Sequence, residues 1–265
     1  MTQVLTLVRT RQPRDEAAPS RGETTMPSRN AAREACALLF ARIAPAGALG
    51  AEERRAIVEA VVEILPVASG RSLPPLRQPS LHLQILVQGW AYRAQTLRDG
   101  ARQITDVLLP GDFCGWTPSA TDDNAQDTRA AGAVRVAVLR KDLIAGGALP
   151  AVERGWDWAR DAEARILRSR LVSLGRRDAH GRVAHFISEV HDRLQRVGLA
   201  EGGVFTCPLT QEQLADVLGL TTVHINRVLQ RIRYQGLATV NKRRVTILDL
   251  AGLHAAAGFE EAGLI

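Results

Sequence analysis

The chain has 265 residues, which is enough for one large domain or two modest ones. Hydrophobic residues make up 46% of the sequence and charged residues 23%, a balance typical of a globular protein with a substantial core. No apolar run approaches the roughly 18 residues of a transmembrane helix, and the apolar run at residues 4–8 is too short for a signal peptide. The three cysteines lie too far apart for a disulfide framework or a metal cluster of closely spaced thiolates (Cys36, Cys114 and Cys207). We therefore expect a soluble protein of the cytoplasm that has no metal site.

The formal net charge is +6, from 34 basic and 28 acidic residues, and all but two of the basic residues are arginine. Codon usage alone explains such a preference for arginine over lysine. A partner rich in phosphate is the alternative, because the forked guanidinium group matches phosphate oxygens. The total does not decide between these explanations, so the position of the charges along the chain matters more.

The N-terminal half changes character twice. Residues 1–30 are rich in Arg, Pro, Ser, Thr and Glu and predict a disordered tail, in which Met26 is a second candidate start. Apolar residues then recur at helical spacing over residues 31–66. Residues 81–146 predict short strands instead, with alternating apolar residues and a hairpin-turn signal at Asp99-Gly100. Regular short strands with turns between them indicate a sandwich or a small barrel.

Residues 147–177 predict one long helix, with acidic residues first and arginines last, an order that suits the helix dipole. Four apolar residues follow the 3-4-3 spacing of paired helices: Ala164, Leu167, Leu171 and Leu174. This spacing fits a seam between two copies of the chain and fits equally well a surface helix packed on its own domain. After Arg177 the pattern is helical again, with a single apolar stripe.

The C-terminal third carries the clearest chemistry. A capping box at Thr210 and Gln213 predicts the start of a helix, and Gly219 permits a sharp turn at its end. Thr221 is placed to cap a second helix, and a hairpin with a basic tip at residues 241–244 follows. Two helices joined by a short glycine turn and followed by such a hairpin predict a winged helix-turn-helix.

The polar face of the second helix is free to bind a partner. At about 100° per residue, Arg227 and Val223 point away from the buried stripe. We expect Arg227 to reach a guanine edge and Val223 to press on a thymine methyl group, while neighbouring residues contact phosphates. The expected DNA-binding residues are Thr221, Thr222, Val223, His224, Asn226, Arg227, Arg231, Lys242 and Arg243.

The charges gather on this same motif. Residues 217–248 contain no Asp or Glu but hold six basic residues, so the charge of this segment is +6. This equals the net charge of the whole chain, and the remaining residues are therefore neutral overall. A solvated surface usually mixes both signs of charge. The clustering therefore predicts a nucleic-acid partner, and a winged domain that binds another protein is the alternative.

The stretch LTQEQLADVLGLTTVHINRVLQRIRYQGL (209–237) resembles the helix-turn-helix of the Crp/Fnr transcription regulators. VQGWAYRAQTLRDGARQITDVLLPGDFCG (87–115) is similar to their β-roll sensor domain. The resemblance implies an α+β fold. Its expected parts are a tail at 1–30, an antiparallel, jelly-roll-like β-roll of cyclic-nucleotide-binding type at 31–146, a dimerisation helix at 147–177, a winged helix-turn-helix at 178–252 and a C-terminal tail at 253–265.

The resemblance also implies a function. It implies a homodimer that reads a near-palindromic operator in double-stranded DNA, with RNA polymerase as a further candidate partner.

No Gly-rich phosphate loop, nucleophile elbow or pair of carboxylates stands out in the sequence, so we do not expect an enzyme. A cupin-like enzyme is disfavoured as well, because residues 81–146 contain one His and no Glu.

The departures from the family pattern concern its effector. Trp116 stands where cyclic-AMP-binding members are expected to have a Glu, and the expected Arg-Ser loop at 121–127 holds three acids, which would repel a phosphate. Only Cys36 lies near the N-terminus, whereas an iron–sulfur cluster normally needs four thiolates. We therefore expect neither cyclic AMP nor a cluster, and the cofactor stays unknown. In the second helix Thr222 and Val223 replace the family's common Arg and Glu, which predicts an altered operator sequence.

Other residues have simpler explanations. His180 and His191 share a helix face but stand about 16 Å apart at 1.5 Å per residue, too far for one metal ion. Cys114 is expected to be a small buried residue rather than a redox sensor. The four tryptophans either pack in the core or line a pocket where the strands meet the long helix: Trp90, Trp116, Trp156 and Trp158.

Overall fold

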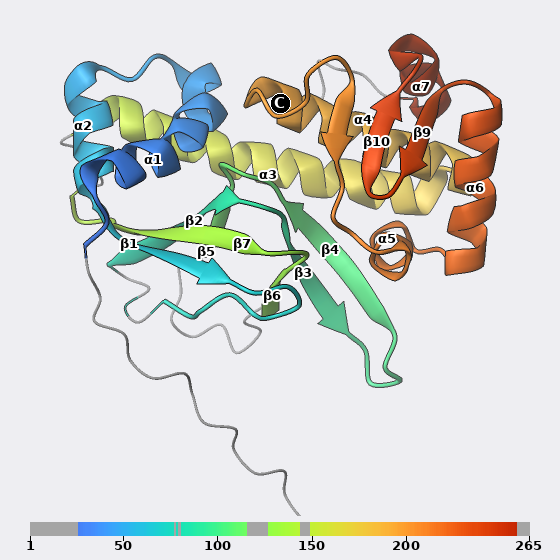
Figure 1. The fold of residues 1–265 in the computed structure, drawn as a ribbon, viewed down its shortest axis with the longest axis horizontal. Coiled ribbons are helices and arrows are strands. Elements are labelled where there is room, and N and C mark those ends of the chain that lie inside the picture. Colours follow the sequence, from blue (N-terminus) through green and yellow to red (C-terminus); the bar gives the residue numbers. More distant parts are fainter. Residues whose placement is uncertain (1–25, 77, 79–80, 116–126, 144–148, 259–265) are drawn as a thin grey trace, which may run out of the picture.

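The computed structural model describes residues 26–76, 78, 81–115, 127–143 and 149–258. A long helix, α3 (Pro150–Arg176), extends along the molecule, with the N-terminal helices and strands near its first part and the C-terminal helices near its last part (Figure 1). The predicted order of antiparallel strands, long helix and winged helix-turn-helix is confirmed.

Two helices precede the first strand: α1 (Arg29–Ile43) and α2 (Ala51–Glu59), with a 3-10 turn at Ala44–Ala46 between them. The prediction of helix throughout 31–66 is wrong at its end, because β1 (Val61–Val67) pairs with β7 (Val134–Arg140). A short apolar run fits either a helix or a strand, and pairing with a segment far along the chain decides between them. Since β1 is an edge strand, it also tolerates a proline.

The N-terminal strands form two antiparallel sheets, with the orders β1-β7-β2-β5 and β4-β3-β6. Because side chains alternate along a strand, β2 buries Leu83 and Ile85 with residues of α1 and Leu86 with residues of the other sheet. The predicted turn at Asp99-Gly100 joins β3 and β4, and Gly100 takes a positive φ of 87° there. The remaining strands of this part are β2 (His82–Gln88), β3 (Ala91–Thr96), β4 (Arg102–Leu108), β5 (Phe113–Gly115) and β6 (Asp127–Ala130).

The C-terminal part is built on α4 (Ala179–Arg196), which Asp178 caps by accepting a hydrogen bond from the N–H of Gly181 at 2.7 Å. Its apolar stripe is buried. After α4 come β8 (Val204–Thr206), α5 (Gln211–Leu218), α6 (Thr222–Tyr234), β9 (Ala238–Asn241), β10 (Arg244–Ile247) and α7 (Leu250–Ala257).

Both expected tails are shorter than predicted. Helix α1 begins at Arg29, where Ser28 accepts a hydrogen bond from the N–H of Ala31 at 3.2 Å, and residues 1–25 lie outside the described part of the chain. At the other end, α7 extends into the expected tail at 253–265 because Asp249 caps it and Leu253 is fully buried. The domain boundaries themselves stay a prediction.

One hydrophobic core crosses from the strands to the C-terminal part. Trp90, just before β3, and Ile104 of β4 belong to the same buried cluster as Phe186 of α4 and Phe205 of β8. The rings of Trp90 and Phe205 stack with centroids 6.4 Å apart. The two parts therefore share a core instead of being joined only by α3.

A buried network of charges crosses the same junction. Arg170 of α3 donates to Asp106 of β4 at 2.9 Å and to Glu189 of α4 at 2.7 Å. Arg193 of α4 bridges Glu189 at 3.0 Å and Asp112 at 2.5 Å. The network continues through ion pairs of Arg42 with Asp112 and of Arg93 with Asp106 and Glu163.

The network is balanced in charge, with four arginines and four carboxylates. Burial by itself would raise the pKa of Asp112, but the charges of Arg193 and Arg42 outweigh it and hold that pKa below its usual value. The same competition, with Arg170 and Arg193 as the cations, lowers the pKa of Glu189. Both carboxyl groups are therefore ionised at neutral pH.

None of the described helices is both long enough and apolar enough to cross a membrane.

Candidate nucleic-acid interface

The two helices of the predicted motif are held by the caps that the sequence indicates. The N–H of Gln213 donates to the hydroxyl of Thr210 at 3.1 Å, and the N–H of Thr210 donates back to the amide oxygen of Gln213 at 2.9 Å. Gly219 ends α5 with a left-handed φ of 61°. Thr221 then caps α6 by accepting from the N–H of His224 at 3.2 Å. The helix-turn-helix is therefore confirmed residue by residue at its turns.

Helix α6 buries one face and presents the other to solvent. Ile225, Val228 and Ile232 are buried, whereas Val223 is 60% exposed and Tyr234 is 93% exposed. The nine residues expected to bind DNA are all exposed: Thr221, Thr222, Val223, His224, Asn226, Arg227, Arg231, Lys242 and Arg243. Figure 1 shows α6 at one end of the molecule.

The wing is the hairpin of β9 and β10, whose end residues Asn241 and Arg244 pair across a two-residue turn. Lys242 and Arg243 form this turn with positive φ angles of 46° and 72°. Their side chains line a hollow of about 360 Å³ together with Asn226 of α6. The fold thus brings α6 and the tip of the wing together, although they are separate in the sequence.

Two polar residues outside the expected set organise this surface. Gln211 accepts a hydrogen bond from the side-chain amide of Asn226 at 3.1 Å, which ties α6 to the start of α5. Arg182 donates to the carbonyls of Leu174 at 2.7 Å and Leu218 at 3.2 Å. One guanidinium group therefore joins the end of α3 to the turn of the motif. Neither contact has a signal in the sequence, because both depend on tertiary packing.

One of the three cysteines, Cys207, lines the hollow between α6 and the wing. Cys36, Cys114 and Cys207 are free and buried. Burial raises the pKa of the Cys36 and Cys207 thiols to about 12 and raises that of Cys114 as well. Thiols with raised pKa values are poor nucleophiles at neutral pH, which agrees with a packing role.

The described residues contain no group of three or more His, Cys, Asp or Glu side chains placed to hold a metal ion. His180 lies 2.6 Å from the amide oxygen of Gln235, and His191 lies beside Phe205 with ring centroids 6.5 Å apart. Trp116 and residues 121–126 of the expected effector loop lie outside the described residues, and Asp127 begins β6.

Comparisons with known proteins agree with this geometry. Residues 181–256 match a family model described as a Crp-like helix-turn-helix domain. The chain is 31% identical over 185 residues to the transcriptional activator protein FnrL of Cereibacter sphaeroides, which covers 67% of this chain and 73% of FnrL. It is also 31% identical over 163 residues to the nitrogen fixation regulation protein FixK of Bradyrhizobium diazoefficiens, covering 61% of this chain and 68% of FixK.

A solved structure shares the fold. FixK2 from Bradyrhizobium japonicum is similar with a TM-score of 0.63 and 24% identity, covering 73% of this chain and 96% of FixK2. The exposed helix-turn-helix, the strands before it and these sequence relatives lead to the same result. The chain belongs to the Crp/Fnr family of transcription regulators.

Proposed function

We propose that this Crp/Fnr-type DNA-binding transcription regulator works as a homodimer that binds a near-palindromic operator. The observation that carries the proposal is the exposed surface formed by α6 and the wing, which holds six basic residues and no acidic residue between positions 217 and 248. Each α6 enters a major groove, and the two grooves lie about one helical turn apart on the DNA.

The residues on this surface divide into two roles. Arg227 and Val223 lie at the centre of the exposed face, so Arg227 reads a guanine edge and Val223 contacts a thymine methyl group. Thr222, Arg231 and the wing tip contact phosphates on either side. Thr221 accepts a hydrogen bond from the backbone in the free protein, so its main part is to fix the start of α6.

Two copies pair along α3 in this proposal. Leu167 and Leu171 are 41% and 72% exposed on this helix and form part of the spacing expected for a seam. Apolar side chains in such a row are covered when two helices pair. The N-terminal strands form the sensor, α3 connects it to both DNA-binding parts, and RNA polymerase is a further partner. The dimer acts where the chromosome lies, in the cytoplasm, and carries out no catalysis.

Arg227→Ala tests the base contact. The DNA is a duplex selected from a random pool by the wild-type protein, and affinity is measured by fluorescence anisotropy. We expect binding to weaken by about 10- to 100-fold, as for the loss of one bidentate base contact, and the preference at one base pair of each half-site to disappear.

Arg98→Ala is the matched control, because Arg98 is an exposed arginine on the β3–β4 hairpin. It should leave affinity and base preference unchanged. Unchanged base preference in Arg227→Ala would contradict the assignment of Arg227. Failure of the wild-type protein to enrich any sequence from the pool would instead favour the alternative, a winged domain that binds a protein.

A further inference from the structure

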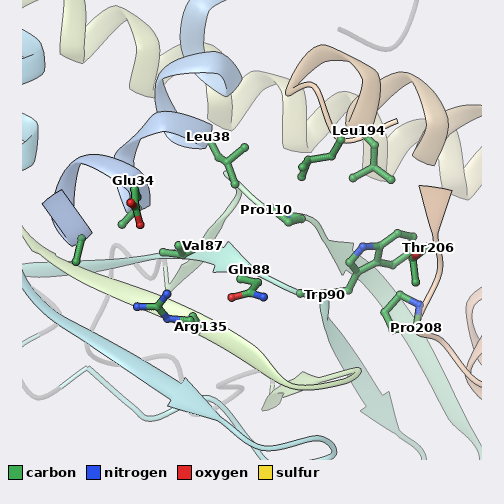
Figure 2. A pocket seen from close by; sticks show the side chains of 14 residues that line it. Glu34, Leu38, Val87, Gln88, Trp90, Pro110, Arg135, Leu194, Thr206 and Pro208 are labelled. Atoms are coloured by element: carbon green, nitrogen blue, oxygen red, sulfur yellow. The ribbon is translucent and has the colours of Figure 1, made fainter. Parts of the chain in front are cut away.

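A cavity of about 510 Å³ lies where three parts of the molecule meet. Leu38 and Glu34 of α1 line one side of it. Trp90, just before β3, and residues of β2 and β7 line the second side, and Leu194 of α4 lines the third. Figure 2 shows Glu34 and Arg135 at one end of this cavity and Trp90, Thr206 and Pro208 at the other. The volume falls within the roughly 300–1,000 Å³ typical of small-molecule sites.

The cavity has an apolar body and a polar end. Leu38, Val87 and Leu194 supply apolar surface. Arg135 and Gln88, which are register partners on β7 and β2, supply polar groups. Within the described part of the chain, neither of these two side chains takes part in a hydrogen bond or an ion pair that would occupy it. An apolar wall that ends at an unoccupied guanidinium group is complementary to a molecule with an apolar body and an anionic head.

We propose that this cavity binds a small amphipathic carboxylic acid, with its carboxylate on Arg135 and its apolar body between Leu38, Trp90 and Leu194. Glu34 lies across the polar end from Arg135, so the carboxylate binds on the Arg135 side and Glu34 weakens its binding through repulsion (Figure 2). Bound there, the ligand touches the strands and the DNA-binding part at the same time.

Among the described residues, the hollow between the strands and α3 is much smaller than this cavity. The hollow there is about 20 Å³, and its lining includes the network residues Asp106, Asp112, Glu163 and Arg193. These groups already satisfy one another. Among the described residues, a ligand at the junction therefore finds both room and an unoccupied charge, which the interior beside α3 does not provide.

The cavity is also connected to the wing. Thr206 of β8 lines it and is the register partner of Arg244 of β10. Trp90, which lines it from the other side, stacks on Phe205, the register partner of Val245. A ligand that contacts Trp90 and Thr206 therefore acts on the strand that carries the wing, and its binding should change the affinity for DNA.

Decanoate is the first probe, and 1-decanol is its uncharged counterpart. Binding to the full chain is measured by calorimetry and by tryptophan fluorescence. We expect one saturable decanoate site per chain. Arg135→Gln should weaken decanoate binding about tenfold, as for a lost charge-assisted hydrogen bond, and leave decanol binding unchanged. Glu34→Gln should strengthen decanoate binding a few-fold.

Arg98→Gln and Glu52→Gln are the matched controls, since each removes the same charge from an exposed position outside the cavity lining. Both should bind decanoate like the wild type. The proposal is overturned if decanoate binding does not saturate, if Arg98→Gln weakens it as much as Arg135→Gln, or if Glu34→Gln and Arg135→Gln act in the same direction.

The connection to DNA is tested separately and rests on the proposed function. Saturating decanoate should change the affinity of the wild-type protein for its selected duplex at least threefold, and the same concentration should have no effect on Arg135→Gln. Unchanged affinity in the wild type would overturn the connection to the wing. If the chain bound no DNA at all, the proposed function would be wrong. The decanoate measurement would still show whether the cavity binds a carboxylic acid.

Discussion

The turn of the wing is unusual because Lys242 and Arg243 both take positive φ angles, 46° and 72°. Two-residue hairpin turns of this kind are normally built from Asn and Gly, which adopt that conformation at low cost. For other residues the conformation costs of order 1 kcal/mol each. The chain thus keeps two basic side chains at the tip of the wing at the expense of stability.

Replacing the turn by Lys242→Asn with Arg243→Gly should therefore have opposite effects on stability and binding. We expect the free energy of unfolding to rise by about 1–2 kcal/mol, measured in urea, because the strain is relieved. DNA binding should weaken, and the slope of log affinity against log salt should become shallower by about one for each lost phosphate contact.

The double variant Lys242→Ala with Arg243→Ala is the matched control. It removes the same charges but keeps residues that are strained at positive φ. It should lose DNA affinity to a similar extent without any gain in stability. Equal stabilisation of both double variants would show that the strain argument is wrong.

His185 provides a second prediction at the scale of a residue. It is buried on α4, with its Nε2 atom 2.9 Å from the hydroxyl of Ser169. Burial lowers its pKa from 6.5 to about 4; the charges of Arg177 and Arg170 act in the same direction and that of Glu189 opposes them. Because the unfolded chain binds the proton more readily, stability is complete above pH 6.5 and falls as the pH drops toward 4.

Urea unfolding at pH 7.5 and pH 5.5 measures this effect. We expect the wild type to lose about 1 kcal/mol between these two values, since each pH unit inside the window is worth about 1.4 kcal/mol. His185→Gln cannot titrate and should lose much less. His224→Gln is the control, at an exposed position on α6, and should behave like the wild type. If His185→Gln lost as much stability as the wild type between these pH values, the loss would not come from His185.

At the scale of elements, α3 packs one face against its own chain and exposes Leu167, Leu171 and Val172 on another. Gly155 packs so closely on Ile43 that a Cβ added to Gly155 would lie 2.9 Å from the Cδ1 atom of Ile43. Leu171, further along the helix, is 72% exposed. Leu171→Glu should therefore leave the fold intact but place a charge in the proposed seam.

We expect Leu171→Glu to shift the protein from dimer to monomer in sedimentation and to weaken operator binding at least tenfold, because the two half-sites are then bound independently. Leu97→Glu is the control, since Leu97 is 62% exposed on the β3–β4 hairpin. If Leu171→Glu remained dimeric, the dimer seam would not lie at Leu171.

The elements differ in how well the sequence predicts them. The turns at Asp99-Gly100 and Gly219 and the caps at Thr210 and Thr221 were predictable because each depends on neighbouring residues. Strand β1 was not, because its partner lies about seventy residues further along the chain. The DNA-binding residues were predictable as exposed positions, whereas the contacts of Arg182 depend on packing that no local pattern records.

For the whole molecule, the charge network and the shared core make the strands and the DNA-binding part a single unit. The sequence shows neither, since the four arginines and four carboxylates of the network are scattered from Arg42 to Arg193. Charges usually lie at the surface, so burial of this set could be recognised only in three dimensions. The cavity lined by Trp90 could likewise not be located before the fold was known.

A substitution of Glu189 tests whether the strands and the DNA-binding part unfold as one unit. Glu189 is buried in α4 and accepts hydrogen bonds from Arg170 at 2.7 Å and Arg193 at 3.0 Å. Glu189→Gln keeps the shape but leaves a positive charge uncompensated, which should cost about 3–5 kcal/mol. Because the core crosses the junction, tryptophan fluorescence and circular dichroism should report one transition in urea, shifted as a whole. Glu201→Gln, at an exposed position, should shift nothing. Two separate transitions would mean that the strands and the DNA-binding part unfold independently.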